Sequence, residues 1–300
     1  MEVERNIKNV VVLTYSKIKY SLLAIIQIRL KLEESIFKLM NIKYVKRTDS
    51  MNRRILKTIS MIEDLNIEEF KSLNIGVEIQ DFTEPNLSRD EISRIISGYK
   101  SKFKNFTNIK AMHGPFLDLK PSSPDKLIRN VSFNRYLDTI KIAQQLDIDY
   151  IIFHSQINPY LNHPSQRKLN NIQSKEFWED IWSKTIDYRG IILLENIFEE
   201  TPNMLKELIE TINLPNVKIN LDIGHAKLGK VNLEEWIKEL KDSIEYIHIH
   251  SNDGLYDNHQ SLSRDEIDNL YNLLDKYNIN PILSLEYKVS NLVHEIERYI

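Results

Sequence analysis

VKINLDIGH, residues 217–225, is the stretch that decides the fold of this 300-residue chain. It begins as an apolar, strand-like run and ends on Asp222 and His225, two side chains of the kind that bind metal ions. Five other apolar runs also end on a histidine or a glutamate: IKAMH (109–113), YIIFH (150–154), IILLE (191–195), IEYIHIH (244–250) and ILSLE (282–286). In a parallel barrel, the side chains at the C-terminal ends of the strands converge on one mouth. The repeated pattern therefore predicts parallel strands whose last residues share a site.

Strand-like and helix-like segments alternate from residue 53 onward. Strands are expected at 54–60, 74–80, 109–113, 150–154, 191–195, 217–222, 244–250 and 282–286. Helices are expected at 66–73, 88–103, 125–146, 174–187, after Thr201 and Pro202, and at 232–241, 263–277 and 290–300. The strand runs are almost continuously apolar, as in strands buried on both faces. Eight such units predict a (β/α)8 barrel, whose typical size is about 250 residues. The alternative, a doubly wound open sheet, would not place ligands at so many strand ends.

Residues 1–50 have a different character from the rest of the chain. They carry ten basic and five acidic side chains, and their apolar residues recur at steps of three or four, which places them on one helical face: Ile25, Ile28, Leu32, Ile36 and Leu39. We interpret residues 1–50 as an N-terminal amphipathic extension outside the functional domain, and residues 51–300 as the metal-dependent catalytic domain. The alternative is an arm that docks on the barrel, a partner or a membrane surface.

Composition excludes several classes of site. The chain has no cysteine, which excludes disulfides, thiolate zinc sites and a cysteine nucleophile, and a cytoplasmic location is expected. No apolar run reaches the roughly 18–20 residues that span a bilayer, and there is no glycine-rich nucleotide loop. Residues 51–300 carry 30 basic and 38 acidic side chains, a poor match for a phosphate backbone. Nucleic acid is therefore disfavoured as a partner, although a local basic groove would still allow it.

Nine side chains of the metal-ligand type stand at or just after the predicted strand ends: His113, His154, Glu195, Asp222, His225, His250, Asp257, His259 and Glu286. A single histidine at a strand end is more often a packed or surface residue than a ligand, so the ordered set carries the prediction. Imidazoles and carboxylates that converge on one mouth would build a divalent metal site, and zinc or manganese is the expected ion.

Six short motifs in the same order resemble the xylose-isomerase-like TIM barrels: MHGPFLDLKPSSPD, IIFHS, LLEN, LDIGHA, HIHSNDG followed by DNH, and SLEY. This superfamily includes the sugar phosphate isomerase/epimerase group and the endonuclease IV class. The resemblance covers about residues 53–300. It implies a TIM barrel that binds one to three divalent metal ions in each chain.

The two groups imply different uses of the same residues. The endonuclease IV class binds three zinc ions through nine residues, and all nine have counterparts here, from His113 in HGPF to Glu286 in SLEY. Sugar-isomerase relatives hold one metal through the counterparts of Glu195, Asp222, His250 and Glu286, and the two glutamates are their acid and base. The chain departs from the nuclease pattern at IFEETP, DIGHAKLGK and QSLS, which disfavours abasic DNA as the substrate.

We predict a divalent-metal-dependent isomerase or epimerase of a sugar or sugar phosphate, with Glu195 and Glu286 moving the proton next to a metal-bound carbonyl. The alternative is a zinc phosphodiesterase of the endonuclease IV type, and a third possibility is a barrel that has lost catalysis and binds a ligand. Glu78 and Asn196 are predicted substrate contacts, as are His113 and His154 if they bind no metal. His248 is expected to be a packed interior histidine, or else a donor to a metal ligand.

Overall fold

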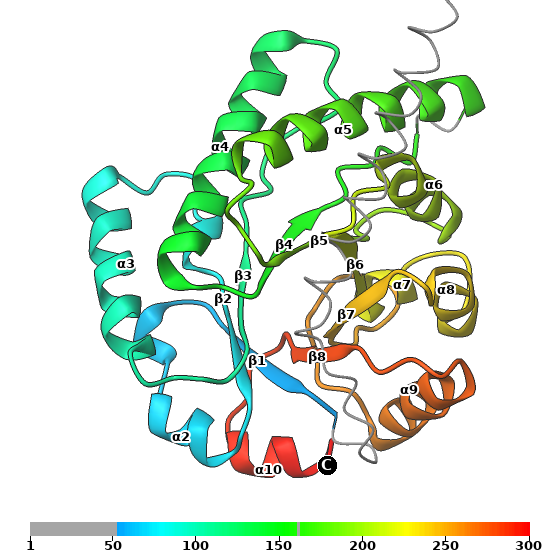
Figure 1. The fold of residues 1–300 in the computed structure, drawn as a ribbon. Helices are drawn as coiled ribbons and strands as arrows, with labels where there is room; N and C mark the ends of the chain where they lie inside the picture. Colours follow the sequence, from blue (N-terminus) through cyan, green and yellow to red (C-terminus); the bar gives the residue numbers. More distant parts are fainter. Residues whose placement is uncertain (1–52, 161–162) are drawn as a thin grey trace, which may run out of the picture. The chain divides into compact units, whose positions relative to one another are not determined.

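Eight parallel strands close into a barrel in chain order (Figure 1). The structure is a computed structural model and describes residues 53–160 and 163–300, so the predicted extension at 1–50 lies outside the described residues. The strands are β1 (Ile55–Ile59), β2 (Gly76–Ile79), β3 (Lys110–His113), β4 (Tyr150–His154), β5 (Ile191–Glu195), β6 (Val217–Asp222), β7 (Ile244–Ile249) and β8 (Ile282–Leu285). Pairing of β1 with β8, Ile55 opposite Leu283, closes the sheet. The predicted (β/α)8 barrel is confirmed.

Helices surround the strands (Figure 1). They are α2 (Ile67–Ser72), α3 (Arg89–Phe103), α4 (Lys126–Leu146), α5 (Pro164–Lys184), α6 (Asn203–Ile212), α7 (Ile223–Lys227), α8 (Leu233–Leu240), α9 (Arg264–Lys276) and α10 (Leu292–Glu297). Two short 3-10 turns, η1 (Ile62–Asp64) and η2 (Asp81–Thr83), follow β1 and β2. Local sequence sets several helix starts. Ser88 and Ser263 each form a capping box with a glutamate three residues later, which satisfies free N–H groups at the helix start.

Two elements differ from the prediction. Helix α5 begins at Pro164, ten residues before the predicted start, so much of the segment 155–173 is helical. Its first half, PSQRKLNNIQ, is too polar to show helical periodicity, although proline suits the first turn of a helix. After β6, the short helix α7 stands where the sequence predicted no helix, because the Asp222 side chain accepts a hydrogen bond from the His225 N–H and caps the helix.

The inside of the barrel is apolar toward the N-terminal ends of the strands and polar toward their C-terminal ends. The apolar part is one cluster of buried side chains: Leu56, Ala111, Tyr150, Ile152, Leu193, Tyr246 and Ile282. Because strand side chains alternate between two faces, inward positions further along the same strands carry polar groups. These are also buried: Glu78, His113, Glu195, Asn220, Asp222, His248, His250 and Ser284. A second, larger core lies between the strands and the helices.

The polar groups therefore meet at the C-terminal end of the barrel, where the sequence placed the site. None of the helices in the described part of the chain has the length and apolar character needed to cross a bilayer.

Candidate metal centre

The centre of the site is built from β5, β6, β7 and the residue after β8. We call Glu195, Asp222, His250 and Glu286 the central group. Register places Glu195 beside Asn220 and Asp222 beside His248, so the strand ends lie level with one another. His250 Nε2 lies 2.9 Å from Asp222 Oδ2, and donor atoms of Asp222, His250 and Glu286 all lie within 4.8 Å of one another. Three of the four residues of the predicted one-metal core thus lie together, and Glu195 meets Asp222 in a further group with His248.

Two histidines extend the site on one side. We call His113, His154 and Glu195 the inner group, whose donor atoms also lie within 4.8 Å of one another. His113 Nε2 is 3.5 Å from Glu195 Oε2, and the two imidazole rings are nearly perpendicular at 5.2 Å. The Phe116 ring stacks on His154 at 4.2 Å and holds its orientation. Glu195 therefore belongs to both the inner and the central group.

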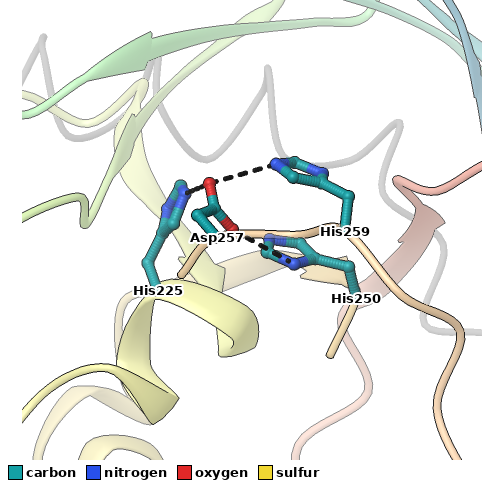
Figure 2. A group of neighbouring side chains, drawn as sticks. All are labelled: His225, His250, Asp257 and His259. Atoms are coloured by element: carbon teal, nitrogen blue, oxygen red, sulfur yellow. Dashed lines mark hydrogen bonds and ion pairs between the residues drawn. The ribbon is translucent and has the colours of Figure 1, made fainter. Parts of the chain in front are cut away.

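The outer group is formed by His225, His250, Asp257 and His259 (Figure 2). Asp257 Oδ2 lies 3.1 Å from Nε2 of both His225 and His259, so one carboxylate stands between two imidazoles. The His250 and His259 rings stack at 4.0 Å. His259 has a φ of 45°, a left-handed conformation that is uncommon for a residue with a side chain. The loop after β7 adopts this strained backbone at the residue that places the His259 imidazole against the Asp257 carboxylate.

Three of the histidines are oriented by backbone carbonyls. Each Nδ1–H can donate to a main-chain oxygen 2.8–2.9 Å away: His113 to Gly114, His225 to Asn196 and His259 to Glu286. In the neutral ring this leaves Nε2 with a free lone pair, and that atom faces a carboxylate in every case. Fixing the tautomer through the second nitrogen is the usual arrangement of metal-binding histidines.

The carboxylates of the site are held in their ionised form. Burial alone would raise the pKa of Glu195, but His248, His113 and His225 together bring it well below its ordinary value. The same opposition between burial and neighbouring imidazoles lowers the pKa of Asp222, Glu286 and Asp257. His154 behaves differently, because burial lowers its pKa to about 3 and keeps the ring neutral. Ionised carboxylates and neutral imidazoles are the forms that bind metal ions.

Three amides fix the carboxylate-bearing strands. Asn196, a predicted substrate contact, uses both ends of its side chain on the Asp222 main chain, at 2.9 Å each. Asn220 donates to Glu195 Oε2 at 3.0 Å, and Gln80 donates to Glu286 Oε1 at 2.7 Å. Sequence reasoning missed Asn220 and Gln80. The available signal was a polar residue at an inward position of an otherwise apolar strand run.

Glu78 occupies a different place from the one predicted. It was predicted to contact the substrate, but it lies inside β2 and is fully buried. Its carboxylate accepts hydrogen bonds from Tyr246, His248 and Ser284, all inside the barrel. Gln80, two residues further along, is the residue that reaches Glu286. The structure thus gives Glu78 interior partners in place of a position at the mouth.

The residues present fit a divalent cation. Nδ1 of His248 and Nδ1 of His250 are buried and form no hydrogen bond with any described residue. Gly224 leaves room for the His250 ring, since a Cβ there would stand 2.0 Å from its Cε1 atom. Oxygen and imidazole donors of this kind accept zinc, manganese, cobalt or iron. The nine predicted ligands therefore form three groups linked by Glu195 and His250, although their binding of metal stays a prediction.

The family model described as the xylose isomerase-like TIM barrel matches residues 73–299. The chain belongs to this family. Two relatives from Methanocaldococcus jannaschii are the uncharacterized proteins MJ1614 and MJ1311. The first is 33% identical over 190 residues, 59% of this chain and 70% of the relative. The second is 29% identical over 191 residues, 59% of this chain and 64% of its own length, so the match spans less than two thirds of that relative.

Three solved structures share the barrel fold. A D-tagatose 3-epimerase-like protein is 24% identical with a TM-score of 0.63, over 82% of this chain and 94% of the other. The TTHB071 protein from Thermus thermophilus, soaked with zinc chloride, is 21% identical with a TM-score of 0.63, over 83% and 98%. AP endonuclease, family 2, from Brucella melitensis is 18% identical with a TM-score of 0.55, over 80% and 94%. At these identities, the likeness concerns the fold of the xylose isomerase-like family alone.

Proposed function

We propose that this chain is a metal-dependent hydrolase of phosphate esters that holds two or three divalent cations at the barrel mouth. The outer group carries the proposal. A one-metal isomerase needs only the central group. This chain has a further group of donors, in which Asp257 Oδ2 lies 3.1 Å from the Nε2 atoms of both His225 and His259. Together with His113 and His154 of the inner group, these donors supply further sites on either side of the central one.

Charge favours the same conclusion. Four carboxylates belong to the predicted ligand set: Glu195, Asp222, Asp257 and Glu286. With neutral imidazoles, one divalent ion leaves two negative charges, which would repel an anionic phosphate. Three divalent ions would leave two positive charges and would attract it. The number of bound ions therefore decides whether the mouth suits a phosphate ester or an uncharged sugar.

The residues of the chain have definite tasks in this proposal. The central, inner and outer groups would hold the cations, which polarise a phosphate and lower the pKa of a bound water toward about 7. Glu195 is shared between two groups, and Asn220 fixes one of its oxygens. Gln80 likewise fixes Glu286. The carboxylates are ionised before any ion arrives, whereas their contacts raise the pKa of His113 and His225, so metal binding would release protons from these rings.

The test is metal content followed by hydrolysis. Protein purified without chelator is analysed for metal per chain, then assayed with bis(p-nitrophenyl) phosphate, an abasic oligonucleotide and a panel of ketoses and ketose phosphates. The proposal expects two or three ions and phosphate ester hydrolysis. Asp257→Asn should lose one ion and most of the hydrolysis, whereas His294→Gln, an exposed histidine on α10, should change neither. One ion per chain without any hydrolysis would contradict the proposal.

Sugar isomerisation or epimerisation is the second candidate, and one observation favours it. Glu195 ends β5 and Glu286 follows β8, so two ionised carboxylates approach the mouth from different sides. One could remove the proton next to a carbonyl and the other could return it. Turnover of a ketose in deuterium oxide should then place deuterium on that carbon, and Glu286→Gln should abolish the exchange. Retained exchange in this variant would exclude Glu286 as the acid or base.

A further inference from the structure

His248 is held inside the barrel by a carboxylate that the site itself does not use. It lies on β7 two residues before His250 and is fully buried. Its Nε2 atom is 3.0 and 3.1 Å from the two oxygens of Glu78. Glu78 also accepts hydrogen bonds from the Tyr246 hydroxyl at 2.7 Å and from the Ser284 hydroxyl at 2.9 Å. These contacts place the proton of the neutral ring on Nε2 and leave Nδ1 with a free lone pair.

The Nδ1 atom of His248 faces three carboxylates of the central group. It lies 2.9 Å from Glu286 Oε2, 3.3 Å from Glu195 Oε2 and 3.6 Å from Asp222 Oδ2. The contact with Glu286 is short enough for an ion pair, but Nδ1 forms no hydrogen bond with any described residue.

Those separations are the ones expected between atoms that bind the same ion. With metal–ligand distances of about 2.0–2.2 Å, neighbouring donor atoms around one octahedral or tetrahedral cation stand about 2.8–3.6 Å apart. His248, Glu195 and Asp222 already form one of the buried groups whose donor atoms lie within 4.8 Å of one another. Beside three carboxylates, Nδ1 carries either a proton or a cation, because an unshared lone pair there would face only negative charge.

We propose that His248 binds the central cation through Nδ1 and that Glu78 is the positioning residue that holds it there. The arrangement repeats that of His113, His225 and His259, with a buried carboxylate in place of the backbone carbonyl and the opposite nitrogen as ligand. A carboxylate partner fixes the ring and strengthens it as a donor. The central site thereby has two imidazoles, His248 and His250. This inference requires a bound cation but neither hydrolysis nor isomerisation.

A crystal structure of the zinc-loaded wild-type protein tests the contact directly. We expect His248 Nδ1 at about 2.0–2.1 Å from a zinc ion, with Nε2 still on Glu78. A structure in which Nδ1 lies more than about 3 Å from every zinc ion, donating a hydrogen bond to Glu286, would overturn the proposal. This measurement needs no variant and no substrate, so it separates the inference from the proposed reaction.

Metal affinity of variants supplies the second test. In competition with a chromophoric chelator, Glu78→Gln should bind its tightest ion about 10–100-fold more weakly, and His248→Gln should lose that ion. His294→Gln serves as the matched control because it removes an exposed imidazole of α10 that belongs to none of the three groups. Melting temperatures of the metal-free proteins are measured beside the affinities. If His248→Gln kept wild-type metal affinity and number while its metal-free form melted lower, His248 would be a packing residue and the proposal would fail.

Discussion

Gly224→Ala should disable the central group by a direct collision. Gly224 is the second residue of α7, and a Cβ added to it would stand 2.0 Å from Cε1 and 2.2 Å from Nδ1 of His250. Ordinary contacts begin near 3.4 Å, so the ring or the helix must move by about 1.4 Å. Neither can move freely, because His250 is buried, bonded to Asp222 and stacked on His259. Overpacking of this kind costs about 1–3 kcal/mol of stability.

The functional effect should exceed the effect on stability. A displacement of about 1 Å in a catalytic group can lower the rate about 100-fold, and here the displaced group is a predicted ligand. We expect Gly224→Ala to remain folded in urea denaturation but to bind its central ion at least 10-fold more weakly in the chelator competition. Gly98→Ala is the matched control, since its Cβ would meet mainly the flexible end of Ile62, at 2.6 Å, and none of the predicted ligands. Unchanged metal affinity in Gly224→Ala would refute the assignment of His250 as a ligand.

Two further predictions concern pH and the amide that holds Glu195. The hydrogen bond that His259 donates to the Asp257 carboxylate raises the pKa of His259 from 6.5 to about 9, so its stabilisation of the metal-free protein is complete below pH 6.5 and is lost as pH rises through about 9. Urea unfolding of the metal-free protein, measured with chelator present, should show this decline. Zinc-loaded protein should become more stable over the same pH range, because metal binding needs neutral imidazole. An unfolding free energy of the metal-free protein that does not change with pH would contradict the prediction. Asn220→Ala removes the 3.0 Å hydrogen bond to Glu195 Oε2 and should cost about 1.5–3 kcal/mol in unfolding free energy. It should also weaken metal binding about 10-fold, and wild-type values for both quantities would show that Asn220 does not hold the carboxylate.

Much of the fold could be predicted because each strand is a short apolar run that ends in a ligand-type residue. Parallel strands buried on both faces need such runs, so β4, β5 and β6 have the predicted bounds. The family resemblance placed all nine candidate ligands in one site, and the structure brings them together. The start of α5 could not be predicted, because its polar first half has no apolar periodicity and depends on packing against the rest of the chain.

Tertiary structure decided how the candidate ligands are divided and oriented. Sequence spacing indicates that His113, His225 and His259 stand near strand ends, but the carbonyls that orient His225 and His259 belong to residues 29 and 27 positions away in the chain. The same holds for Glu78 and His248, which are 170 residues apart and meet only because the barrel is closed. An apolar run indicates which side chains must be buried, because the hydrophobicity of each residue is a property of the sequence itself. The direction of a lone pair depends on partners from other strands, and only the closed barrel brings those partners within hydrogen-bonding distance.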